Sequence, residues 1–270
     1  MANQTIQLAT RRGAFRVAVD GDPSAPALIL SNSLGTTLEM WEPQVAALSK
    51  GHRLIRYDTR GHGGSPVTAG PYRFDDLGQD VLAVLDALEV GKAAFCGISM
   101  GGYTGLWLGI HAGPRLHAIA VCNSAAKIGT AQAWNERAAM VRAGGAAGMR
   151  ALAESAPGRW FTEGFIQAQP AVVRHMQDGL ARLDPEGYAA CCDALAASDL
   201  RAGVGRIAVP TLLLAGASDP VTTLADAEAL QACIAGAQLA VVPASHISNL
   251  EAPRAFDKAV LDFLAGSRAA

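Results

Sequence analysis

Short apolar runs recur along this 270-residue chain, and helical patterns separate most of them. Several runs, such as AAFCGIS at residues 93–99 and PTLLLAGAS at residues 210–218, are apolar at most positions, which is typical of strands covered on both faces. Residues 74–90 instead carry apolar side chains at helical spacing. This alternation predicts an α/β fold, a mostly parallel sheet with helices on both faces. The runs that we expect to be strands are FRVAV, ALILS, HRLIRYD, AAFCGIS, LHAIAVCNS, PTLLLAGAS and AQLAVVPAS.

The alternation stops between residues 124 and 200, where no strand pattern is convincing. AWNERAAMVRAGGAAGMRALAES predicts two helices broken at Gly144 and Gly145. PAVVRHMQDGLARL and PEGYAACCDALAAS predict two more, each with proline in the first turn. A helical insertion in an α/β sheet is typical of a cap or lid at the sheet's edge. We therefore divide the chain into a first core part (1–123), a helical cap (124–200) and a second core part (201–270).

Composition and charge exclude several classes of protein. Half of the residues are hydrophobic, and the net charge of -2 favours neither nucleic acid nor an anionic membrane surface as a partner. No run approaches the roughly 20 apolar residues of a membrane span, and the first 15 residues lack the apolar stretch of a signal peptide. The five cysteines have no metal or disulfide spacing, so we expect reduced, buried thiols in a cytoplasmic protein without metal or cofactor.

The pentapeptide GISMG at residues 97–101 lies between a strand pattern and a helical pattern. This is the context of a nucleophile elbow, G-x-S-x-G, where a sharp turn strains the serine backbone and requires glycine on either side. Ser99 would then stand at a helix N-terminus, whose free N–H groups favour an oxyanion. An ordinary glycine-rich turn is the alternative. Glycines at 101, 105 and 109 favour the elbow, because they line one helix face and suit close packing on the sheet.

A serine nucleophile needs a base, and in this arrangement the chain order is serine, acid, histidine. Of the six histidines only His246 follows the last strand pattern, and Asp219 ends the strand pattern before it. The Asp-Pro pair also suits a plain turn. Some hydrolases carry the acid after an earlier strand, but that position holds the uncharged Asn123. We therefore predict a catalytic triad of Ser99, Asp219 and His246.

An oxyanion hole needs two backbone donors. One comes from the residue after the nucleophile and the other from the loop after the third strand. Those positions predict the N–H groups of Met100 and of Leu34, in the loop SNSLGTTLEMW. Many enzymes of this kind have His-Gly in that loop, where this chain has Asn32 and Ser33, but a backbone donor depends little on side-chain identity.

The sequence resembles the α/β-hydrolase superfamily over essentially its whole length, and RYDTRGHGGS matches the superfamily's turn after its fourth strand. Within the superfamily it is similar to the 3-oxoadipate enol-lactonases. The motifs that carry this similarity are LSNSLGTTLEMW, YDTRGHGGS, FCGISMGG, RWFT, DPEGYAACCDA and ASHISNLE. The resemblance implies cofactor-free hydrolysis of an enol-lactone to 3-oxoadipate in the β-ketoadipate pathway. The partner that it implies is a small-molecule lactone with a free carboxylate.

That carboxylate requires a cation or good hydrogen-bond donors in the pocket. We select Trp134 as a pocket wall with a donor N–H, although core packing is an ordinary role for a tryptophan. We select Arg137 as the cation, although an arginine on a helix is more often a solvated surface charge. Arg60, in the RGHG turn, suits a structural role. The other basic residues of the cap are Lys127, Arg142, Arg150, Arg159, Arg174 and Arg182.

Two other functions stay open. The same triad would suit a general carboxylesterase or a cofactor-free perhydrolase. A ligand-binding receptor that retains the triad is an alternative of another class.

Overall fold

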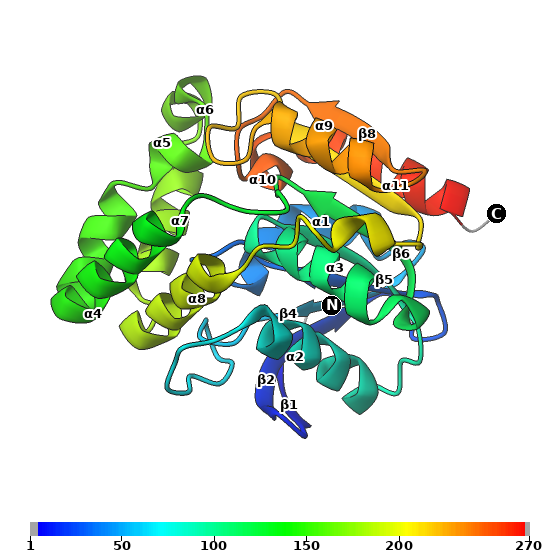
Figure 1. Ribbon diagram of the computed structural model, residues 1–270, viewed down its shortest axis with the longest axis horizontal. Helices are drawn as coiled ribbons and strands as arrows, with labels where there is room; N and C mark the ends of the chain where they lie inside the picture. Colours follow the sequence, from blue (N-terminus) through cyan, green and yellow to red (C-terminus); the bar gives the residue numbers. More distant parts are fainter. Residues whose placement is uncertain (1–4, 268–270) are drawn as a thin grey trace.

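A computed structural model describes residues 5–267 of the chain, and an eight-stranded sheet forms its centre (Figure 1). The strand order is β1-β2-β4-β3-β5-β6-β7-β8. β2 runs opposite to the seven other strands, and every pair that does not include it is parallel, so the predicted α/β fold is confirmed. The strands are β1 (Ile6–Thr10), β2 (Gly13–Asp20), β3 (Ala27–Ser31), β4 (Arg53–Tyr57), β5 (Ala93–Ile98), β6 (Leu116–Cys122), β7 (Thr211–Gly216) and β8 (Gln238–Val242).

Each of the expected strands is present, but β1 was not expected. It is an edge strand that pairs with β2 alone, and its residues are exposed or only half-buried. An exposed edge strand needs no continuous apolar run, so its sequence IQLAT lacks the signal that marks the others. By contrast, every residue of β5 is buried, as expected of a central strand.

Helices cover both faces of the sheet (Figure 1). On one face α2 packs beside α3, and on the other α1 packs beside α11. The helices of the core are α1 (Glu42–Leu48), α2 (Phe74–Ala87), α3 (Met100–His111), α9 (Leu224–Cys233), α10 (Ser248–Glu251) and α11 (Pro253–Ser267), with short 3-10 turns at Leu38–Trp41, Gly113–Arg115 and Val204–Arg206.

The segment 124–200, called the cap segment below, holds five helices between β6 and β7 and lies beside the core (Figure 1). The expected break in its first helix occurs at Gly145, whose φ of +50° and ψ of -134° are not helical. Two short helices, α5 and α6, were not expected. The three-part division of the chain stays a prediction. The five helices are α4 (Ala131–Glu154), α5 (Pro157–Trp160), α6 (Glu163–Ala168), α7 (Pro170–Ala181) and α8 (Pro185–Ala197).

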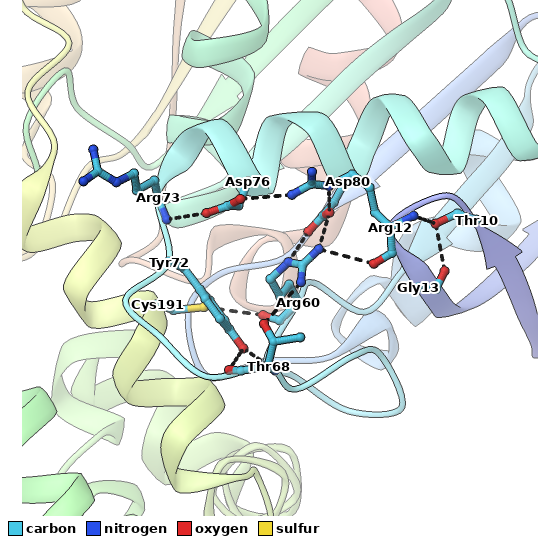
Figure 2. Close-up of polar contacts among 10 residues, drawn as sticks. All are labelled: Thr10, Arg12, Gly13, Arg60, Thr68, Tyr72, Arg73, Asp76, Asp80 and Cys191. Carbon is cyan, nitrogen blue, oxygen red and sulfur yellow. Dashed lines mark hydrogen bonds and ion pairs between the residues drawn. The ribbon is translucent and has the colours of Figure 1, made fainter.

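A buried ion-pair network fixes the turn after β4 (Figure 2). Arg60 donates from Nε and Nη2 to the two carboxylate oxygens of Asp80 on α2, at 2.7 and 2.6 Å. Arg12, between β1 and β2, donates from Nε to the same carboxylate at 2.6 Å. The Arg60 guanidinium also lies over the ring of Tyr72, 5.8 Å from its centre. These contacts agree with the structural role expected of Arg60, because they join the turn to α2 and to the β1–β2 hairpin.

The expectation of buried thiols is correct for four of the five cysteines and wrong for Cys233, which is exposed where α9 ends at the surface. All five thiols are free. Within residues 5–267, no helix is long and apolar enough to cross a membrane.

Candidate active site

Ser99 stands at the turn between β5 and α3, with φ +56° and ψ -114°. Positive φ is strained for a non-glycine residue, as expected of a nucleophile elbow. A Cβ atom at Gly97 would lie 2.3 Å from the carbonyl carbon of Gly101, and one at Gly101 would lie 2.2 Å from the carbonyl oxygen of Ser31. Both glycines are therefore required by backbone contacts, and the turn cannot form with larger residues there.

The predicted glycine face of α3 packs directly on the sheet. A Cβ atom at Gly105 would lie 2.8 Å from the ring of Phe95 on β5, and one at Gly109 would lie 3.1 Å from Ile119 on β6. These close contacts hold α3 against β5 and β6, and Ser99 directly precedes this helix.

Asp219 and His246 meet at the carboxyl end of the sheet. The His246 ring Nδ1 donates to Asp219 Oδ2 at 2.8 Å, and both side chains are buried. Asp219 also accepts from the backbone N–H groups of Val221 and Thr222 and from the Thr222 hydroxyl. Burial is the largest single influence and would raise the pKa of Asp219, but the hydrogen bond and charge of His246, together with the hydrogen bonds from Asn123 and Thr222, lower that pKa below its usual value. An ionised Asp219 orients the imidazole and stabilises its protonated form.

Asn123, which sequence reasoning set aside, supports this pair. Its side-chain Nδ2 donates to Asp219 Oδ2 at 2.9 Å and to the carbonyl oxygen of Ser245 at 3.1 Å. Its Oδ1 accepts from the Ser248 hydroxyl at 2.5 Å. Asn123 follows β6, and Asp219 follows the neighbouring parallel strand β7, so both residues lie at the same edge of the sheet. This placement after adjacent strands is the sequence signal that could have identified Asn123 as a partner of Asp219. Asn123 therefore does not take the place of an acidic residue here, but donates a hydrogen bond that holds the Asp219 carboxylate.

Ser99 and His246 line one cavity of about 180 Å³. The core contributes Ser33, Leu34 and Val221, and the cap segment contributes the opposite wall. The cap residues of that wall are Ile128, Gly129, Ala133, Trp134, Arg137, Arg159, Trp160, Leu180 and Tyr188. Residues of the core thus provide Ser99 and His246, and residues of the cap segment enclose them.

Of the two expected oxyanion donors, Met100 directly follows Ser99, and Leu34 lines the same cavity as Ser99. Met100 is the first residue of α3, so its N–H belongs to the unpaired first turn of the helix. Leu34 lines the cavity, in a turn closed by the hydrogen bond from Thr36 N to Ser33 O at 3.2 Å. Gly35 in this turn has φ +85°, which favours glycine. The role of both N–H groups stays a prediction.

Trp134 lines the cavity, but its N–H is already engaged. The indole Nε1 donates to the carbonyl oxygen of Ile128 at 2.6 Å. The expectation of a donor for substrate is therefore wrong, because a local backbone acceptor takes the N–H. Its ring supports Arg137 instead, whose guanidinium carbon lies 4.7 Å from the ring centre.

Only two cations of the cap segment line this cavity, Arg137 and Arg159. Arg159 donates to the carbonyl oxygen of Ser155 at 2.9 Å. Burial, and then the nearby charge of Arg137, lower the pKa of Arg159. Two like charges thus share a half-buried pocket. The other basic residues point elsewhere: Arg142 pairs with Glu186 and Asp193, Lys127 pairs with Asp199, and Arg150, Arg174 and Arg182 are exposed.

The loop that carries His246 is hydrogen-bonded to the cap segment. Ile247 N donates to the carbonyl oxygen of Trp160 at 3.0 Å. Glu251 accepts from Ser245 N at 2.8 Å and from Thr162 N at 3.2 Å. The motifs RWFT and ASHISNLE, far apart in sequence, therefore meet here. Sequence reasoning did not single out Glu251, because nothing local reveals a contact across 89 residues.

Known protein families and structures that are similar to this chain agree with the fold and the site. A family model described as the alpha/beta hydrolase fold matches residues 26–163. The chain is 51% identical to 3-oxoadipate enol-lactonase 2 of Acinetobacter baylyi, over 92% of this chain and 91% of that protein. It is 46% identical to 3-oxoadipate enol-lactonase 1 of the same organism, over 93% and 94%. Among solved structures it is similar to the enol-lactonase from Burkholderia xenovorans LB400, with a TM-score of 0.93 and 44% identity over 97% of this chain and 100% of that chain. The chain therefore belongs to the α/β-hydrolase family and, within it, to the 3-oxoadipate enol-lactonases.

Proposed function

We propose that this protein hydrolyses 3-oxoadipate enol-lactone to 3-oxoadipate in the β-ketoadipate route of aromatic degradation. One observation carries the proposal beyond family membership. Ser99 and the Asp219–His246 pair share a small cavity with two arginines that suit an anionic lactone. The chemistry uses side chains and backbone groups alone. The free cysteines support a cytoplasmic enzyme, where thiols stay reduced.

The first half of the reaction opens the lactone ring. The Ser99 hydroxyl attacks the lactone carbonyl carbon while His246 Nε2 accepts the hydroxyl proton, since Nδ1 is bonded to Asp219. The N–H groups of Leu34 and Met100 hold the developing oxyanion, and one such donor is worth about 3 to 4 kcal/mol. The ring C–O bond then breaks and releases an enolate that stays attached through the acyl group. The proton that His246 took from Ser99 is then transferred to the enolate, which gives a ketone and leaves His246 neutral.

The second half releases the product. His246 takes a proton from water, and the resulting hydroxide attacks the Ser99 ester in the same oxyanion hole. The Ser99 Oγ–acyl bond breaks, and Ser99 regains its proton from His246. The new carboxyl group gives its proton to solvent, and 3-oxoadipate leaves as a dicarboxylate. No oxidant, reductant or second substrate besides water is needed.

Arg137 and Arg159 anchor the carboxylate that the lactone carries before ring opening. Within residues 5–267, neither arginine forms an ion pair with a protein carboxylate. An anionic ligand therefore relieves the repulsion between them. Trp134 serves as a wall that holds Arg137 in place. A general carboxylesterase would have no need of this pair, so the arginines favour the lactone over an uncharged ester.

The test of the triad is turnover of the enol-lactone, followed by its loss of absorbance. We expect Ser99→Ala and His246→Ala each to lose nearly all turnover while circular dichroism stays that of the wild type. Residues that act as one unit are not additive, so the double variant should be little slower than either single variant. A double variant slowed by the product of both effects would show independent action and contradict the triad. A slow single turnover in which the protein retains the product would favour a receptor.

A further inference from the structure

His62 is a buried histidine in the turn after β4, outside the triad. Its side chain is 1% exposed. The backbone N–H of Gly35 donates to its Nε2 at 2.9 Å, and its Nδ1 lies 3.2 Å from the carbonyl oxygen of Arg60. A nitrogen that accepts a hydrogen bond carries no proton, so the proton is on Nδ1 and points at the Arg60 carbonyl. Burial lowers the pKa of His62 to about 4, which agrees with a neutral ring.

The Gly35 N–H belongs to the loop that carries the proposed oxyanion donor. Thr36 N bonds to Ser33 O, and Gly35 at the third position of this turn has φ +85°, the geometry of a type II turn. The bond to His62 holds the Gly35 N–H on one side. The bond therefore anchors the Leu34–Gly35 peptide. This peptide is joined through the Leu34 Cα to the Ser33–Leu34 peptide, which bears the Leu34 N–H.

The cap segment closes the other side of the same loop. A Cβ atom at Gly35 would lie 2.9 Å from Leu180 on α7 and 3.4 Å from the ring of Tyr188 on α8. The Tyr188 ring also lies 6.5 Å from the His62 ring. Gly35 is thus enclosed between His62 on one side and two cavity-lining cap residues on the other.

The turn of His62 is itself held on both sides. Arg60 is fixed by Asp80, and its carbonyl oxygen accepts from the Cys191 thiol of α8 at 3.4 Å (Figure 2). A Cβ atom at Gly61 would lie 2.6 Å from the carbonyl oxygen of Gly187, so the turn and the start of α8 touch backbone to backbone. The imidazole therefore projects from a rigid base, which suits a residue that sets the position of another group.

We propose that His62 is a positioning residue for the hydrolysis, whose neutral imidazole holds the Leu34–Gly35 peptide so that the Leu34 N–H faces the oxyanion. The inference depends on the proposed function of the Ser99 site. It differs from a purely structural role, because it predicts a loss confined to the chemical step. Substrate binding depends on the cap arginines and should not change.

Three substitutions separate the two hydrogen bonds of the ring. His62→Gln can supply an acceptor near the Nε2 position, His62→Asn can supply only a donor near Nδ1, and His62→Leu supplies neither. We expect kcat to fall by about ten- to a hundredfold in the Asn and Leu variants, part of what loss of an oxyanion donor costs. The Gln variant should keep most of its kcat. KM should change by less than about threefold in all three, because only the transition state uses the oxyanion hole.

An inhibitor tests the same idea without turnover. A small boronic acid that forms a tetrahedral adduct with Ser99 should bind more weakly to the Asn and Leu variants, in proportion to their kcat, while 3-oxoadipate should bind them as tightly as the wild type. Equal kcat in all variants, or a Gln variant as slow as the Leu variant, would overturn the proposal. So would a loss that is confined to KM.

A measurement on the unaltered protein applies even if the variants fail to fold. Long-range proton–nitrogen NMR spectra of protein with labelled histidine should show His62 with the proton on Nδ1 and a bare Nε2. A proton on Nε2 would exclude the bond from Gly35 and refute the inference. Either result is independent of the triad, because Ser99→Ala tests that separately.

Discussion

Replacing the two cavity arginines tests how this protein selects a charged substrate. Arg137→Met and Arg159→Met each remove a cation but keep an apolar stem of similar reach, so the wall beside Trp134 is largely preserved. A hydrogen bond to a charged group contributes about 1.5 to 3 kcal/mol. At about 1.4 kcal/mol per factor of ten, each variant should lose about ten- to a hundredfold in kcat/KM for the enol-lactone.

The assay compares kcat/KM for the enol-lactone with that for an uncharged ester of similar size. Each variant should hydrolyse the uncharged ester within about threefold of the wild-type rate, since that ester makes no charge-assisted bond. Arg150→Met is the matched control, because Arg150 is an exposed arginine of the same helix as Arg137, outside the cavity. If both arginines hold one carboxylate, the double variant should lose less than the product of the single losses.

Two results would refute this reasoning. Equal losses on the charged and the uncharged substrate would mean that the arginines only shape the cavity. Losses no larger than those of the Arg150→Met control would mean that the carboxylate binds elsewhere.

The remaining predictions concern two buried aspartates. Asp219→Asn should fold normally but lower kcat by about 10²- to 10⁴-fold, because an amide favours the wrong imidazole tautomer, and unchanged steady-state kinetics would return Asp219 to a turn residue. Because the pKa of Asp219 is lowered in the folded protein, its ionised form stabilises the fold at neutral pH. This contribution is lost as the pH falls through the folded pKa. The free energy of unfolding of Asp219→Asn, measured by urea titration, should therefore lack that part of the decrease at acid pH. Asp80→Asn leaves the buried Arg60 without its counter-ion and should lower the free energy of unfolding by about 3 to 5 kcal/mol. A urea midpoint equal to that of the wild type would contradict the role of the network.

Much of the site followed from the sequence, because its signals are local. A central parallel strand must be apolar along its length, so β5, β6 and β7 were recognisable from their own residues. The elbow needs glycine where backbones touch, and GISMG provides it. The chain order of serine, acid and histidine then selected Asp219 and His246, which the structure brings within 2.8 Å.

Tertiary structure alone decided which side chains complete the site. Sequence reasoning selected Arg137 as the cation, but only the structure shows that Arg159 faces the same cavity and that Arg150 does not line it. Asn123 supports Asp219, and His62 reaches Gly35, through contacts that join residues 96 and 27 positions apart. Periodicity and motifs describe a segment's own backbone and exposed face, whereas these roles depend on the partner that packs against it. That partner is set only when the cap segment and the sheet come together.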